Sequence, residues 1–252
     1  MKLSVCINSV TGKMDRLDAI RLSKKLGYSA VEFWEGGPSL DVAAFKKVLG
    51  DEGLKLACMG MARNLVDHAA RPAFLEDVKT SLANTEALGA RAFIATTGNE
   101  IAGVSRAEQR QSIVDGLKAA APLMSGSGKI MVLEPLNILV NHKGYFLYSS
   151  LEAFDIIREV GCPEIRVLFD IYHQQISEGN LIQNITENIE LIGHFHVAGN
   201  PGRGEPYIGE INYKDVFLAA DDAGYTGYAG LEYWPKGDME ESLRQCLALY
   251  EA

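Results

Sequence analysis

Apolar residues in this chain fall into short runs that alternate with segments of helical periodicity. Nearly continuous, β-branched-rich runs predict strands of a parallel sheet, which are buried on both faces. Between them apolar residues recur at helical spacing, and Gly27, Gly89 and Gly224 stand where helices should end. The pattern predicts strands at residues 2–7, 30–34, 54–59, 92–96, 129–134, 165–169, 192–197 and 228–233.

A helical segment follows each predicted strand. These helices are expected at residues 14–26, 40–49, 72–88, 106–124, 149–160, 181–189, 213–223 and 239–250. Eight strand–helix units in 252 residues match the count and length of an α/β protein with a (β/α)₈ TIM barrel. A doubly wound open sheet is the competitor, but the first strand is not followed by a Gly-rich dinucleotide-binding turn. We therefore expect one TIM-barrel domain over residues 1–252.

Composition narrows the class of partner. The chain is 47% apolar and 23% charged, which is typical of a soluble globular protein, and its net charge of −9 opposes binding to nucleic acid or an anionic membrane. The four cysteines form no CxxC pair and are predicted to be reduced core thiols. The sequence shows neither a signal peptide nor an apolar run near the ~20 residues of a membrane span, so a cytoplasmic protein is expected. Its oligomeric state stays open, a homo-oligomer included.

Acidic and imidazole side chains stand where the last four predicted strands end. They are Glu134, Asp170, His196 and Glu232. In a TIM barrel the carboxyl ends of the strands carry the catalytic residues, so these four should face one another. A single such carboxylate is often only a helix cap, but three at one mouth repel one another unless a cation neutralises them. Mostly oxygen ligands with one imidazole predict a divalent ion, Mn²⁺ or Mg²⁺, and Co²⁺ would fit as well.

Other polar residues lie close to these positions. His173 is three residues beyond Asp170 and could bind a substrate hydroxyl or orient a metal ligand. His194 shares a strand face with His196, one layer deeper, and is either a substrate contact or a buried, hydrogen-bonded barrel residue. The Gly-rich loop at residues 199–206 is either a simple turn or an anion site in which Arg203 binds a substrate carboxylate.

Several longer motifs resemble a known family. They are LEPLN (133–137), GYFL (144–147), LFDIYHQQISEGN (168–180), IGHFHVAGNPGRGEP (192–206), GEINY (209–213) and GLEYWP (230–235). In this order they resemble hydroxypyruvate isomerase and its relatives among the xylose isomerase-like TIM barrels. The resemblance covers about residues 130–236, whereas the N-terminal half is similar only in general layout.

The resemblance implies roles for individual residues. Metal-ligand positions correspond to Glu134, Asp170, His196 and Glu232. Of these, Glu134 and Glu232 also fall on the positions of the paired acid and base, while His173 and Arg203 fall on substrate contacts.

The chain also departs from that family. Hydroxypyruvate isomerases have Gln where His196 stands, and the sugar epimerases of the superfamily have His. Residues 141–143, Asn-His-Lys, replace an acidic-X-Pro turn, and Trp34 and the loop at residues 63–68 also differ. These positions line the side that should bind the distal part of a substrate, so the identity of the substrate stays open.

The hypothesis from sequence is a metal-dependent isomerase for a small hydroxy-carbonyl compound. It interconverts hydroxypyruvate and tartronate semialdehyde through a cis-enediolate, with Glu134 and Glu232 as acid and base. Arg203 favours a substrate that carries a carboxylate, so a ketose 3-epimerase or another sugar isomerase ranks second. An abasic-site endonuclease needs a basic groove and more histidine ligands, and a non-catalytic sugar-binding barrel would be indifferent to metal.

Overall fold

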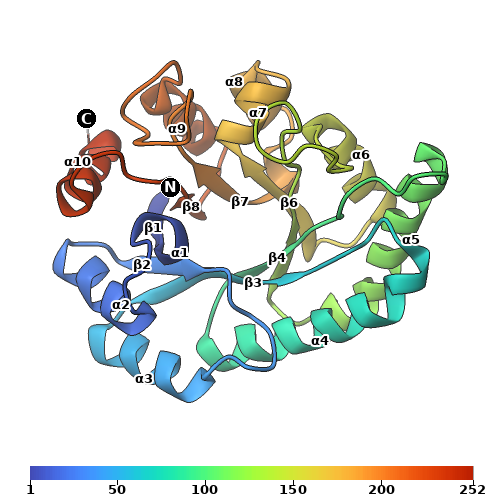
Figure 1. Ribbon diagram of the computed structural model, residues 1–252, viewed down its shortest axis with the longest axis horizontal. Helices are drawn as coiled ribbons and strands as arrows, with labels where there is room; N and C mark the ends of the chain where they lie inside the picture. The colour runs from blue at the N-terminus through green and yellow to red at the C-terminus, as the bar shows by residue number, and fades with distance from the viewer. Residues whose placement is uncertain (252) are drawn as a thin grey trace.

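The computed structural model describes residues 1–251 and shows a closed barrel of parallel strands (Figure 1). Within these residues the strands are β1 (Lys2–Cys6), β2 (Ala30–Phe33), β3 (Lys55–Ala62), β4 (Ala92–Ala95), β5 (Ile130–Leu133), β6 (Ile165–Asp170), β7 (Ile192–Val197) and β8 (Tyr228–Leu231). Each strand pairs with the next along the chain, and β8 pairs with β1. The TIM-barrel prediction is confirmed, while one domain over residues 1–252 stays a prediction.

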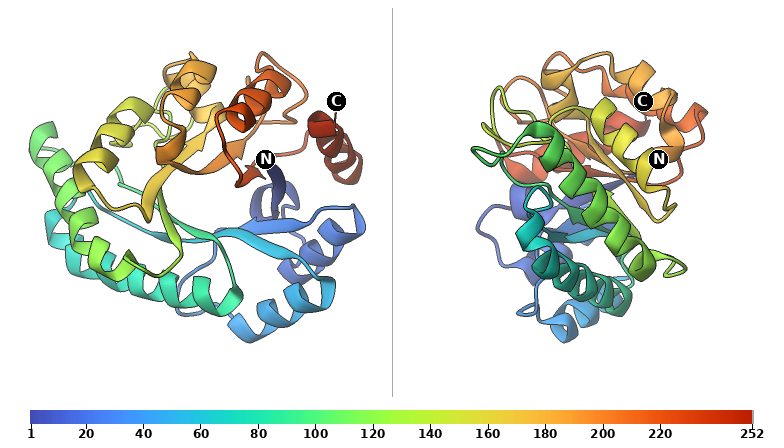
Figure 2. Two further views of the ribbon diagram at one scale, coloured as in Figure 1. Left: turned by 180° about the vertical axis from the view of Figure 1, so that it is seen from behind. Right: turned by 90° about the vertical axis from the view of Figure 1, so that its right-hand side faces the viewer.

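Helices surround the strands on the outside of the barrel (Figures 1 and 2). They are α1 (Ile7–Val10), α2 (Arg16–Lys25), α3 (Val42–Glu52), α4 (Arg71–Leu88), α5 (Arg106–Met124), α6 (Ser150–Val160), α7 (Ile171–Ser177), α8 (Leu181–Thr186), α9 (Tyr213–Asp222) and α10 (Met239–Glu251), with 3₁₀ turns at His68–Ala70 and Ile189–Leu191. Helix α10 lies beside the N-terminus (Figure 2), and Tyr28 donates a hydrogen bond to the Leu243 carbonyl at 2.7 Å. The last helix is thereby tied to the residues that lead into β2.

Aromatic side chains fill the layer between the sheet and the helices. Phe169 of β6 stacks on Phe154 of α6 at a centroid distance of 6.3 Å and meets Phe195 of β7 edge-on at 6.0 Å. All three rings are fully buried. Burial of each ring stabilises the fold by roughly 1.5–3 kcal/mol, which is consistent with the apolar sequences of the strands.

Several predicted elements have other bounds in the structure. The first strand ends at Cys6, because α1 begins at Ile7. The third strand runs to Ala62, past a register shift where Gly60 adopts a φ of +64°. The helix expected at residues 181–189 is α8 followed by a 3₁₀ turn, and α7 directly after β6 was not expected. Helices as short as α1 and α7 span too few turns to produce a recognisable hydrophobic period.

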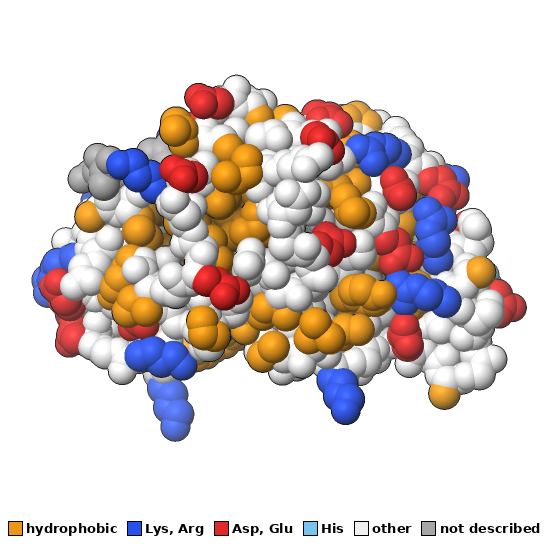
Figure 3. Space-filling model, turned by 90° about the horizontal axis from the view of Figure 1, so that it is seen from above, with side chains coloured by type: hydrophobic (Ala, Val, Ile, Leu, Met, Phe, Trp, Pro, Cys, Tyr) orange, Lys and Arg blue, Asp and Glu red, His pale blue; other side chains and the backbone are white. Residues whose placement is uncertain are grey.

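The outer surface carries charges of both signs. On the face drawn in Figure 3, acidic and basic side chains are interspersed with apolar ones. None of the helices within residues 1–251 is both long enough and apolar enough to cross a bilayer.

Candidate metal and catalytic site

The four strand-end residues converge at the carboxyl end of the barrel. Glu134 follows β5, Asp170 ends β6, His196 lies in β7 and Glu232 follows β8. All four are buried, and one ligand atom from each lies within 4.8 Å of the others. The Nδ1 atom of His196 is 3.3 Å from Glu134 Oε1 and 3.4 Å from Glu232 Oε2. The expected convergence is present, while the roles of these residues stay predictions.

Burial opposes the ionisation of the three carboxyl groups in this cluster. It raises the pKa of Glu134 to about 7, although His196 acts in the opposite direction. Burial also raises the pKa of Asp170, a shift that Arg203 reduces. For Glu232 burial would raise the pKa too, but His196 and Arg203 hold it below its ordinary value. The carboxylates therefore compete for nearby positive charge.

The donor set fits a divalent cation. Three carboxylates and one imidazole are ligands of the kind that Mn²⁺ and Mg²⁺ bind. His196 Nδ1 is buried and has no aligned hydrogen bond among the described residues. A buried polar atom without such a partner indicates an ion, a water or a ligand at this place.

His173 presents a hydrogen-bond donor beside the cluster. Its Nδ1 accepts hydrogen bonds from the Asn137 backbone N–H at 3.3 Å and from Asn137 Nδ2 at 2.6 Å. Burial lowers the pKa of His173 well below its ordinary value, so the ring is neutral and its proton is on Nε2. That Nε2 lies 3.5 Å from Asp170 Oδ2 and makes no hydrogen bond within residues 1–251.

Arg203 faces the cluster from the loop after β7. Its Nη2 forms ion pairs with Glu232 and, at 3.5 Å, with Asp170 Oδ2. The guanidinium lies over the Trp234 ring at 4.9 Å from the ring centroid, and the Trp234 backbone N–H donates to the Arg203 carbonyl at 3.0 Å. The guanidinium therefore already neutralises carboxylates of the protein.

His194 lies beneath the cluster and is fully buried. Its Nε2 donates a hydrogen bond to Glu32 Oε2 at 2.9 Å, which matches the second interpretation from sequence, a buried barrel residue. Glu32 itself was missed. Burial opposes its ionisation, but His194 and His196 hold the pKa of Glu32 at about 2. The available signal was an acidic residue inside the apolar strand AVEF.

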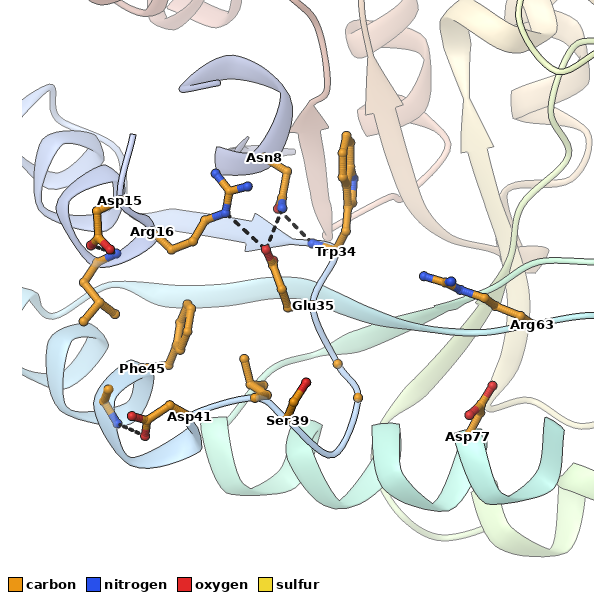
Figure 4. A pocket seen from close by; sticks show the side chains of 15 residues that line it. Asn8, Asp15, Arg16, Trp34, Glu35, Ser39, Asp41, Phe45, Arg63 and Asp77 are labelled. Carbon is orange, nitrogen blue, oxygen red and sulfur yellow. Dashed lines mark hydrogen bonds and ion pairs between the residues drawn. The ribbon is translucent and has the colours of Figure 1, made fainter. Parts of the chain in front are cut away.

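A cavity of about 800 Å³ adjoins the cluster through Trp34 (Figure 4). The indole Nε1 donates to Glu232 Oε1 at 2.9 Å, and the Trp34 backbone N–H donates to Asn8 Oδ1 at 2.9 Å. Asn8 also donates to Glu35, and Arg63 projects into the same space from the end of β3. Trp34 and residues 63–68 stood out in the sequence, whereas Asn8 and Glu35 did not.

Fold and site together define a class: (β/α)₈ barrels with a candidate divalent-metal centre at the carboxyl ends of the later strands. A family model described as "Xylose isomerase-like TIM barrel" matches residues 20–250, and the chain belongs to this family. The resemblance expected from the motifs is thus confirmed.

Relatives in sequence that are named hydroxypyruvate isomerase support an isomerase. Hydroxypyruvate isomerase of Escherichia coli is 29% identical over 255 residues, which cover 97% of each chain. A putative hydroxypyruvate isomerase of Homo sapiens is 36% identical over 176 residues, covering 68% of this chain and 64% of that one.

A crystal structure described as AP endonuclease, family 2, from Brucella melitensis superposes with a TM-score of 0.91, 26% identity and 99% coverage of both chains.

Proposed function

We propose that this protein is a divalent-metal-dependent isomerase of a small hydroxy-carbonyl acid of the hydroxypyruvate type. One observation carries the proposal: Glu134 and Glu232 approach the same imidazole from separate strand ends, within a buried cluster of three carboxylates and one histidine. The relative named hydroxypyruvate isomerase, aligned over 97% of both chains, supports the substrate class.

Two carboxylates at one centre provide a base and an acid for proton transfer. One of Glu134 and Glu232 removes a proton from C3 of hydroxypyruvate, which gives a cis-enediolate. A proton is then returned to C2, and the proton of the C3 hydroxyl moves to the C2 oxygen, so the product is tartronate semialdehyde with the same atoms. A positioned acid or base typically contributes about 10²–10⁴ in rate.

Neighbouring residues orient these groups. The Trp34 indole N–H holds Glu232 Oε1, which leaves Oε2 facing His196 and Arg203. His173 offers its Nε2–H to a substrate oxygen, because Asn137 occupies the other ring nitrogen. Glu134, Asp170, His196 and Glu232 would hold the divalent ion, whose positive charge stabilises the negative charge that develops on the substrate oxygens.

The test combines metal removal with isotope exchange. The purified protein is assayed with hydroxypyruvate in ²H₂O, with Mn²⁺ and again after chelation, and the product is followed by NMR. We expect turnover that needs the ion, and solvent deuterium on C2 of the product, the carbon that receives the proton. Undiminished turnover of the ion-free protein would refute the metal requirement, and a purified protein that holds no stoichiometric divalent ion and is indifferent to added Mn²⁺ would favour a non-catalytic binding protein.

A ketose 3-epimerase or another sugar isomerase is the second candidate. The observation in its favour is that Arg203 already pairs with Glu232 and Asp170 and is less free to bind a substrate carboxylate. The cavity beside Trp34 also offers room for a chain longer than three carbons. In this chemistry the proton returns to the opposite face of the same carbon. A panel of neutral ketoses assayed beside hydroxypyruvate separates the two candidates.

A further inference from the structure

Glu32 lies below the four strand-end residues, inside the barrel, and is only 2% exposed. Its Oε2 accepts hydrogen bonds from Ser4 Oγ at 2.7 Å and from His194 Nε2 at 2.9 Å. Its Oε1 lies 2.9 Å from Nε2 of His196, at hydrogen-bond distance although the N–H is not aligned with it. One carboxylate therefore touches side chains of β1 and β7 and reaches His196 from below.

The barrel keeps space open for this carboxylate. Gly230 of β8 is in register with both His196 and Ser4, and a Cβ atom at Gly230 would lie 2.1 Å from Glu32 Oε1. Any side chain at this position would displace the carboxylate. The place of Glu32 is thus defined by residues of β1, β7 and β8 as well as by its own strand.

Burying a carboxylate inside the barrel costs free energy, so its presence there indicates a function. A carboxylate loses its hydration when it is buried, and a well-packed apolar residue is often the more stable occupant of a core position. Glu32 and the pair of Glu134 and Glu232 lie at different nitrogens of the His196 ring. Nε2 is close to Glu32, and Nδ1 is close to the two other glutamates.

We propose that Glu32 is a positioning residue that keeps the Nδ1 lone pair of His196 directed at a divalent ion; this rests on the proposed metal site. With the ring proton on Nε2, beside Glu32, Nδ1 is left as the ligand atom. Metal-binding histidines commonly donate their other N–H to a carboxylate, which fixes the tautomer and the ring orientation. Ser4 and His194 in turn hold Glu32 from its second oxygen.

Glu32, His194 and His196 also have ligand atoms within 4.8 Å of one another. A second ion in this deeper group is the rival interpretation. The stoichiometry of binding distinguishes the two, because positioning requires one ion per chain and the rival requires two.

The experiment measures Mn²⁺ binding to the full chain from the electron paramagnetic resonance signal of the free ion. We expect one ion per wild-type chain and an affinity lower by roughly 10–100-fold in Glu32→Gln. Gly230→Ala, which displaces the carboxylate but keeps all four ligands, should weaken binding in the same way. Ser23→Ala is the matched control, since it removes a buried serine hydroxyl that is hydrogen-bonded to the Ala19 carbonyl at 2.8 Å within α2 and not to Glu32 or a candidate ligand, and it should bind within about twofold of wild type.

A second measurement reports on the ring itself. In the Mg²⁺-loaded protein, long-range ¹H–¹⁵N spectra should show His196 protonated on Nε2, with the Nε2–H proton shifted downfield by the carboxylate and moved upfield in Glu32→Gln, a change that a merely structural role for Glu32 would not produce. Proton on Nδ1, or Glu32→Gln and Gly230→Ala that fold and bind Mn²⁺ within twofold of wild type, would overturn the positioning role. Two bound ions, one of them lost in Glu32→Gln, would replace it with the second site. A wild-type chain that binds no Mn²⁺ would remove the proposed metal site and this inference together.

Discussion

Single side chains at this site act through the contacts that surround them. Asn137 donates to Nδ1 of His173, so the ring proton is on the other nitrogen. Trp34 donates to Oε1 of Glu232, so Oε2 is left for other partners. Neither Asn137 nor Trp34 is ionisable. The site therefore depends on neutral donors as much as on its charged groups.

Replacing either proposed acid–base residue should nearly abolish turnover. Glu232→Gln and Glu134→Gln keep the size of the side chain but remove its basicity, and we expect kcat to fall by about 10²–10⁴. Steady-state kinetics on a substrate that the wild type converts provides the measurement. Near-normal kcat in either variant would contradict its assignment.

The indole N–H of Trp34 should matter more than its ring. Trp34→Phe keeps an aromatic side chain but removes the hydrogen bond to Glu232 Oε1. Hydrogen bonds to charged groups contribute about 1.5–3 kcal/mol, so kcat should fall by roughly 10–100-fold with folding unchanged. The measurement is kcat alongside circular dichroism, and an unchanged kcat would show that Glu232 does not need this donor.

Elements could be predicted from sequence where their pattern is long enough. The strands were recognisable because both of their faces are buried, and α5 because it spans many turns. Helices α1 and α7 were too short to show a period. Glu32 was missed because its two histidine partners lie on β7, far along the chain, so that only the folded barrel reveals the contact.

The capping box of α5 gives a prediction about stability alone. Ser105 Oγ accepts the Glu108 backbone N–H at 3.2 Å, and the Glu108 carboxylate accepts the Ser105 N–H at 3.0 Å. Ser105→Ala should lower the free energy of unfolding by about 0.5–2 kcal/mol, measured by urea denaturation. Ser105→Asp retains a cap and is the control, so equal losses in both variants would argue against capping as the cause.

For the whole molecule, the four strand-end residues could be named in advance because parallel strands bring all their carboxyl ends to one side of a barrel. The positions of Arg203 and of the Trp34 side chain could not, since they depend on loop conformation. Arg203 has a φ of +53°, a backbone state that sequence alone seldom reveals.

Binding of a divalent ion should stabilise the entire fold. Because the donors are brought together only in the folded barrel, Mn²⁺ should bind the native state in preference to the unfolded chain. At about a hundredfold excess over Kd the gain is about 2.7 kcal/mol, visible as a higher melting temperature in calorimetry. Asp170→Asn should show a smaller rise, and a melting temperature that ignores Mn²⁺ in the wild type would count against the site.

The contacts of Glu32 and Trp34 have a consequence for transplanting this centre. The second half-barrel, from β5 onward, contains all four candidate ligands, yet two of their supports come from β2 and the loop that follows it. Fusing that half to a half-barrel from another protein would transfer the four candidate ligands without Glu32 and Trp34, which support them. Such a chimera needs its partner to supply an inward carboxylate and an indole at matching places.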